Sequence, residues 1–179
     1  MGEPQRGGGG SGEDRISGLP DALTSLKIDG YVHMQGSDLT ALVSTQCPCL
    51  RDLDLFITLI AIFDVSIHSN SLHTLVLRVL ETRRLEILAP SLEELTISIR
   101  LMESQISAPK LVKVAWRDPY DPRLHRFVDA CRSRLQLLRT SGQALSLTKQ
   151  FDEVDELDLS VYLNSQGVLA LTNFITSCF

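Results

Sequence analysis

The chain of 179 residues has little of what marks membrane, secreted or aromatic-rich proteins. Aromatic residues make up 6% of it, with a single tryptophan. The longest apolar run, LFITLIAIF at 55–63, has nine residues, whereas a helix needs about 20 to cross a bilayer. The start, MGEPQRGGGG, has no apolar segment of the kind that a secretory signal requires. We therefore expect an intracellular protein, in the cytoplasm or the nucleus.

Cysteine and histidine are too few and too scattered to predict a metal site. Cys47 and Cys49 have one residue between them, whereas zinc sites commonly have roughly two to four. The formal net charge of −5 argues against general binding to nucleic acids or to anionic membranes. We expect reduced cysteines without a chemical role and no cofactor.

Catalytic motifs are also missing. No combination of Ser, His, Asp or Cys has the arrangement of a nucleophilic site, and GGGGSG at 7–12 is not followed by the Gly-Lys-Ser/Thr of a phosphate-binding loop. Residues 1–12 form a glycine-rich tail that cannot bury apolar surface, so we expect it to be disordered. An enzyme is not expected.

One apolar spacing recurs along the chain and is its strongest structural signal. Five segments share the pattern LxxLxL, with starts at 23, 50, 72, 92 and 111, and VDELDL at 154–159 fits after a gap. The intervals of 27, 22, 20 and 19 residues lie within the ~20–29 range of leucine-rich repeats. Because apolar and polar residues alternate at the end of each motif, we predict short strands at 26–28, 53–55, 75–77, 95–97, 114–116 and 157–159.

Repeats of this length predict a solenoid, because one coil cannot enclose its own apolar side and stacked coils share a continuous core. A short coil leaves little room for a helix on its back side, so VSI at 65–67 and LEI at 85–87 are predicted to be back strands. Ala-Pro at 89–90 and 108–109 predicts sharp turns into the next strand. The expected fold is an α/β leucine-rich-repeat solenoid of about five to six coils. Parallel strands would form one face, and turns, short strands and a few helices the other.

Two segments favour helices. Ser37-Asp38 before LTALVS is typical of a helix cap. Asp121-Pro122 is typical of a helix start, and apolar residues then follow at helical spacing, namely Leu124, Phe127, Val128, Cys131, Leu135 and Leu138. We predict an amphipathic helix within 117–140, packed against the solenoid.

The residues DRISGLPDAL at 14–23 resemble the start of the plant F-box, and LEILAPSLEELTI, ISAPKLVKVAW and DPYDPRLHRF resemble the repeats of plant F-box/LRR proteins. This resemblance covers nearly everything from residue 13 onward. In that family the F-box is a three-helix unit that docks on the Skp adaptor of a cullin ubiquitin ligase, and the repeats hold the protein to be ubiquitinated. Such proteins are not catalytic and act by proximity.

The chain departs from the family pattern after Leu23, where repeat sequence follows at once. Only the first helical turn of the F-box survives, and so short a helix is marginal in water. We therefore assign 1–12 to the tail, 13–23 to a truncated F-box remnant and 24–179 to a repeat region that is incomplete at its C-terminus. Leu19 and Pro20 are the F-box positions that the resemblance carries over as adaptor contacts.

The expected function is protein binding through the repeats, with adaptor binding weak or absent. The alternative is a functional F-box adaptor despite the truncation, and an enzyme is the third and weakest hypothesis. The partner-binding face is predicted from the third and fifth positions of each motif and the position just beyond it. These are Ser25, Lys27, Asp29, Asp52, Asp54, Phe56, Thr74, Val76, Arg78, Glu94, Thr96, Ser98, Lys113, Ala115, Arg117, Glu156, Asp158 and Ser160. For any single one of them, a plain solvated position is the simpler interpretation.

Overall fold

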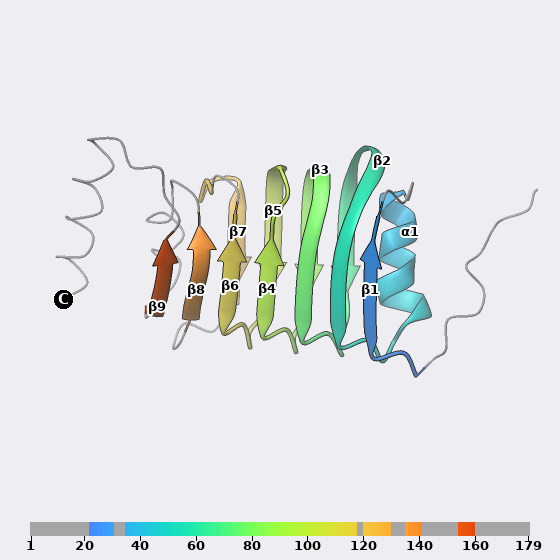
Figure 1. Cartoon of the computed structure of the whole chain (residues 1–179), viewed down its shortest axis with the longest axis horizontal. Coiled ribbons are helices and arrows are strands. Elements are labelled where there is room, and N and C mark those ends of the chain that lie inside the picture. The colour runs from blue at the N-terminus through green and yellow to red at the C-terminus, as the bar shows by residue number, and fades with distance from the viewer. Residues whose placement is uncertain (1–21, 31–34, 118–119, 130–134, 141–153, 160–179) are drawn as a thin grey trace, which may run out of the picture.

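The computed structural model describes residues 22–30, 35–117, 120–129, 135–140 and 154–159. Within them the chain is a parallel β-solenoid of about three turns with one short α-helix (Figure 1). The predicted tail at 1–12 and most of the F-box remnant lie outside the described residues.

The strands are short except for two that run through both layers of the solenoid. They are β1 (Ser25–Asp29), β2 (Asp52–His68), β3 (Thr74–Leu88), β4 (Glu94–Ile97), β5 (Leu101–Ser107), β6 (Lys113–Trp116), β7 (His125–Val128), β8 (Leu135–Thr140) and β9 (Val154–Leu159). Helix α1 (Gly36–Ala41) and the π-helical turn η1 (Leu42–Gln46) connect β1 to β2.

Every strand pairing is parallel, and the strands form two layers. The path β1-β2-β3-β4-β6-β8-β9 makes the front layer, in which β2 and β3 take part through their first halves (Figure 1). The second halves of β2 and β3 pair with each other and continue to β5 and β7, which makes the back layer.

The strand predictions are confirmed in position. Each of the six predicted front segments lies within an observed strand, and 65–67 and 85–87 lie in the back parts of β2 and β3. Strands β5, β7 and β8 were not predicted. The turns that start at β2, β3 and β4 are described without a gap, so the expected count of coils is tested only for them.

The core is a set of ladders of inward-pointing residues from successive coils. In the front layer, the fourth and sixth positions of the motifs are at most 1% exposed from the second coil onward: Leu53, Leu55, Leu75, Leu77, Leu95, Ile97, Val114 and Trp116. Equivalent residues of neighbouring coils pair in register, so each coil covers the apolar side of the next. Leu26 and Ile28 of β1 are only half-buried, because β1 pairs with β2 on one side.

The front strands β2, β4 and β6 are each entered through a tight turn that holds a buried small residue. The backbone N–H of Leu92 donates to the Ala89 carbonyl at 3.1 Å, and that of Leu111 donates to the Ala108 carbonyl at 3.1 Å. The same bond joins Leu50 to Cys47, also at 3.1 Å. Proline follows the small residue in all three turns and sets φ there. Cys47 therefore occupies the position of the two alanines, which explains its burial without any metal chemistry.

Helix α1 closes the back layer at its first strand. The Thr40 hydroxyl accepts a hydrogen bond from the Ser66 backbone N–H at 3.3 Å, and the Ser44 hydroxyl accepts one from the His68 N–H at 3.3 Å. Unpaired backbone N–H groups on an edge strand can pair with another chain. The hydroxyls of Thr40 in α1 and Ser44 in η1 bind two such N–H groups on the back part of β2. The predicted helix is confirmed, but its cap is wrong: the N-cap residue is Gln35, whose N–H donates to the Asp38 carboxylate at 3.0 Å.

The predicted helix within 117–140 is wrong, since His125–Val128 and Leu135–Thr140 are strands. Asp121 does cap a turn, through the Arg123 N–H at 2.9 Å, but the turn is not continued. After this turn the chain continues as β7, which pairs with β5. The side chains of β7 differ in burial: His125 is buried, whereas Val128 is 37% exposed. The open edge of β5 offers this segment a parallel pairing in register, so tertiary context overrides the helical spacing.

Candidate functional site

The candidate site is the outer surface of the front layer, called the front face here. Register aligns its side chains in three rows across the strands. The lower row is Ser25, Asp52, Thr74, Glu94 and Lys113; the middle row is Lys27, Asp54, Val76, Thr96 and Ala115; the upper row is Asp29, Phe56, Arg78, Ser98 and Arg117. Alternation places them opposite the buried leucine ladders.

None of these fifteen side chains is buried, whereas the residues between them are half-buried in β1 and buried in β2, β3, β4 and β6. The structure therefore brings together the residues that the motif positions single out from β1, β2, β3, β4 and β6. Of the remaining predicted positions, Glu156 and Asp158 lie in β9 but their side chains are outside the described part, as are Ser160, Leu19 and Pro20 entirely. Whether the set binds a partner stays a prediction.

Two groups of ion pairs order the charged side chains of the front face. Asp54 lies between two cations: its carboxylate contacts the Arg78 guanidinium and lies 3.6 Å from Lys27 Nζ. Further along, Lys113 Nζ lies 2.7 Å from the Glu94 carboxylate in the next strand. Both groups are solvent-accessible, so each contributes little to stability, in the range of about 0–1 kcal/mol. Their effect is to hold long side chains in place.

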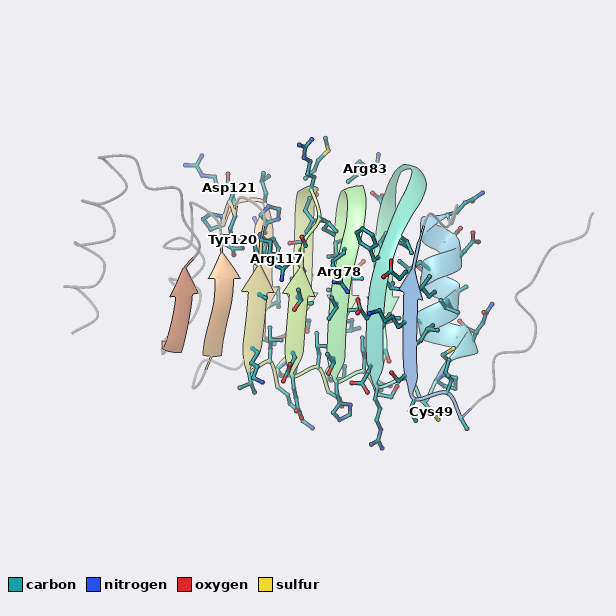
Figure 2. The ribbon with its side chains drawn as sticks, viewed as in Figure 1. Cys49, Arg78, Arg83, Arg117, Tyr120 and Asp121 are labelled. Atoms are coloured by element: carbon teal, nitrogen blue, oxygen red, sulfur yellow. The ribbon has the colours of Figure 1, made fainter. Side chains whose placement is uncertain are left out.

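Phe56 is the prominent apolar side chain of the front face, with 52% of its surface exposed. The Arg78 guanidinium carbon lies 5.9 Å from the centre of its ring, within the range of a cation–π contact. Aromatic residues and arginine are both enriched at protein interfaces. Figure 2 shows Arg78 and Arg117 at a similar height along the strands, with Arg117 just after β6.

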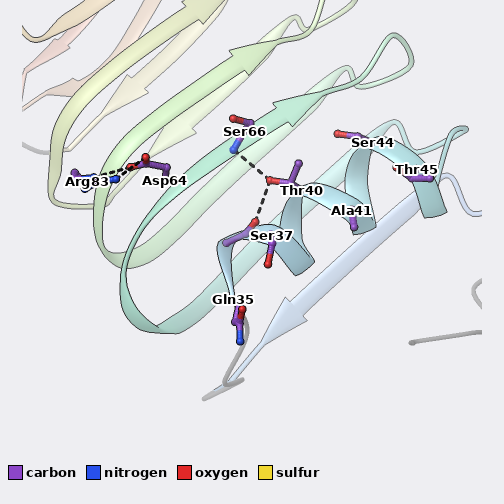
Figure 3. A pocket seen from close by; sticks show the side chains of 10 residues that line it. Gln35, Ser37, Thr40, Ala41, Ser44, Thr45, Asp64, Ser66 and Arg83 are labelled. Atoms are coloured by element: carbon purple, nitrogen blue, oxygen red, sulfur yellow. Dashed lines mark hydrogen bonds and ion pairs between the residues drawn. The ribbon is translucent and has the colours of Figure 1, made fainter. Parts of the chain in front are cut away.

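A shallow hollow of about 630 Å³ lies on the back layer, between α1 and β2, and was not predicted from the sequence. Five of its ten lining residues carry hydroxyl groups, and one of these, the Thr40 hydroxyl, accepts a hydrogen bond from the Ser66 backbone N–H (Figure 3). One wall carries Asp64 and Arg83, joined by two hydrogen bonds of 2.8 and 2.7 Å. The Arg83 guanidinium lowers the pKa of the Asp64 carboxyl. Both side chains are already paired, which leaves the hollow without a group poised for chemistry.

The buried titratable groups belong to the structure and not to a site. Burial raises the pKa of the Cys47 thiol, and both Cys47 and the exposed Cys49 are free. Burial also lowers the pKa of His125, whose Nδ1 lies 3.2 Å from the Ser104 hydroxyl. This Ser–His pair has no access to substrate, because both residues are at most 2% exposed.

Within the described ranges, no group of three or more His, Cys, Asp or Glu side chains is placed to hold a metal ion. In the same part of the chain, no helix is long and apolar enough to cross a membrane. Comparison with protein-family models, with curated proteins and with solved structures returns no match. The front face is therefore judged on its geometry alone.

Proposed function

We propose that this protein is a non-catalytic protein–protein interaction module that binds its partner through the front face. The observation that carries the proposal is the half-exposed Phe56 ring held beside the Arg78 guanidinium, on a face whose described side chains are not buried. Interface centres are rich in aromatic residues and arginine, and a rigid sheet presents them with little loss of entropy on binding.

We further propose that the solenoid is a leucine-rich-repeat domain of the F-box/LRR kind. The LxxLxL spacing supports this, because the fourth and sixth positions of the motifs that start at 50, 72, 92 and 111 fill the core in register. The resemblance of residues 14–23 to the start of an F-box supports descent from a substrate receptor of Skp–cullin–F-box ubiquitin ligases.

Binding to the Skp adaptor is proposed to be weak or absent. Strand β1 begins at Ser25, directly after the remnant, so residues 25–29 do not supply a further F-box helix. The alternative, a functional adaptor, is tested by a pulldown with purified Skp adaptor. The matched control is a version of this chain in which a complete F-box replaces 13–23. The control should bind; tight binding by the unaltered chain would contradict this part of the proposal.

The front face is tested with Phe56→Ala and Arg78→Ala against a back-face control, Arg84→Ala. Once a partner is identified by proximity labelling, each front-face change should weaken its binding by about 1 kcal/mol or more. The control should bind as the unaltered protein does, and the melting temperature of all three should stay nearly unchanged. If both front-face changes unfold the protein, these side chains stabilise the fold and the proposal fails.

A further inference from the structure

Charges on the front face are separated by sign along the solenoid. Strands β1 and β2 carry one cation against three anions, which gives a net charge of −2: Lys27 against Asp29, Asp52 and Asp54. Strands β3, β4 and β6, with the residue after β6, carry three cations against one anion, a net charge of +2: Arg78, Lys113 and Arg117 against Glu94. We call these the acidic pole and the basic pole.

The two poles meet at the ion pair between Asp54 and Arg78, while their centres are well separated. Their centres are about two and a half strand spacings apart, or roughly 12 Å at ~4.8 Å per strand. At physiological ionic strength, exposed charges are screened beyond about 8 Å, so each pole acts mainly on the groups directly above it. Two uncharged side chains lie on the strands where the poles adjoin, Phe56 on β2 and the half-buried Val76 on β3.

We infer that the front face binds a protein segment with the opposite division of charge. Basic side chains of the segment lie over β1 and β2, acidic ones over β3 to β6, and an apolar side chain contacts Phe56. The inference rests on the proposed function and adds the chemistry and the direction of the partner. A uniformly charged polymer such as a nucleic acid gains nothing from this face, because attraction at one pole is offset by repulsion at the other.

The spacing of the poles sets the length of the segment. An extended chain rises about 3.3 Å per residue, so roughly four residues separate its basic group from its acidic group. The segment then crosses the strands instead of adding to the sheet edge. Its direction is fixed, because reversal places like charges over each other, and like-charge contacts are strongly unfavourable.

The first experiment is a selection of random twelve-residue peptides displayed on phage against the full chain. Binders are sorted by whether they lose binding to the Phe56→Ala variant. Front-face-dependent peptides in which a basic and an acidic cluster flank an apolar residue support the inference. Front-face-dependent peptides without that order overturn it and leave the proposed function standing. No front-face-dependent peptide at all overturns both.

The second experiment uses two synthetic peptides of the same composition, each with two lysines, two glutamates and a central leucine. In one the charges form blocks separated by four residues, and in the other they alternate. We expect the block peptide to bind at least about tenfold more tightly, with an affinity that falls as salt rises. Equal affinities overturn the inference.

Charge reversals identify the poles. Asp29→Lys with Asp52→Lys should lower the affinity of the block peptide about tenfold, since neither residue belongs to the ion-pair groups described above. Arg84→Glu, at an exposed back-layer position, is the matched control and should leave the affinity unchanged. Binding of a single-stranded oligonucleotide that competes with the block peptide, or self-association of the chain that is lost in the same variants, would assign the face to another occupant and overturn the inference.

Discussion

The turns between Leu50 and Leu111 are filled mostly by aliphatic side chains, whereas the turn that follows is filled by rings. In the earlier turns, leucine and isoleucine from neighbouring coils stack in register. In the later turn, Trp116 lies 5.3 Å from the Tyr120 ring, 5.2 Å from the His125 ring and 6.1 Å from the Phe127 ring, as measured between centroids. We call these four residues the aromatic corner; Tyr120 is labelled in Figure 2.

The two regions are stabilised in different ways. In the aliphatic turns, each apolar residue is covered by the equivalent residue of the next coil. The aromatic corner depends on particular contacts, among them the Tyr120 hydroxyl, which donates to the His125 carbonyl at 2.8 Å. In the aliphatic turns, one apolar residue can replace another as long as the spacing is kept. In the aromatic corner, the contacts depend on the particular side chains, so a substitution there loses a specific contact. Four predictions test this difference, in order of decreasing effect.

The largest effect is expected in the aliphatic ladders. Leu95 is 1% exposed and lies between Leu75 and Val114, so Leu95→Ala leaves a cavity that the flanking coils cannot fill. The free energy of unfolding should fall by about 2–5 kcal/mol in chemical denaturation. Thr96→Ala, on the outer face of the same strand, is the control and should change it by less than about 0.5 kcal/mol. A loss at Leu95 no greater than at Thr96 would contradict the stacked core.

In the aromatic corner, Tyr120→Phe keeps the ring and removes one hydrogen bond. The buried His125 carbonyl then lacks this donor, and we expect a loss of about 1–3 kcal/mol in the free energy of unfolding. Trp116 is the single tryptophan of the chain, so its fluorescence follows unfolding at this corner. Leu124→Ala, at a residue that is 46% exposed, serves as the control and should be nearly neutral. No loss in Tyr120→Phe would mean that the corner is held by ring packing alone.

Acid should weaken the corner through His125. Burial lowers the pKa of this residue in the folded protein, although Asp121 opposes the shift. Stability is therefore complete above the unfolded pKa of about 6.5, and it falls as the pH drops from there through the folded pKa, because the unfolded chain takes up the proton first. The slope is at most about 1.4 kcal/mol per pH unit for one proton. Denaturation at several pH values should show it, and His125→Gln should remove that part of the pH dependence; an unchanged dependence would contradict the burial of His125.

The smallest effect concerns the entry turns of the aliphatic region. Pro90 restricts the unfolded chain and follows the buried Ala89, so Pro90→Ala should cost about 0.4–1 kcal/mol through the entropy of the unfolded state. Glu93→Ala, at the exposed residue just past the turn, is the control and should be neutral. Denaturant midpoints of the two variants give the comparison. A stabilised Pro90→Ala would show that the turn is strained in the folded protein.

Much of the front layer could be predicted from local pattern. The LxxLxL spacing names the residues that fill the core, such as Leu53 and Leu75, and by alternation it names those that point outward. The entry turns with proline were also predictable, but the equivalence of Cys47 with Ala89 and Ala108 was missed. A search for small-Pro-x-Leu would have found all three, since CPCL, APSL and APKL share it.

The back layer was predicted only at 65–67 and 85–87, and the last described turns could not be predicted in the same way. Residues 124–138 have apolar side chains at helical spacing. The local sequence does not show that β7 and β8 of this segment pair with β5 and β6. The role of Thr40 and Ser44 as partners of the β2 edge was invisible too, because their backbone donors come from residues more than 20 positions away.

Alternation and repeat length, both local properties, thus decide which side chains face the core and that the coils stack, because each coil must cover the apolar side of its neighbour. Only the folded chain decides the register between coils and the choice of strand over helix at 125–128. It also decides how charge is divided over the front face. The hydrogen bonds that determine them join residues about one coil apart, and such bonds form only once the neighbouring coil is in place.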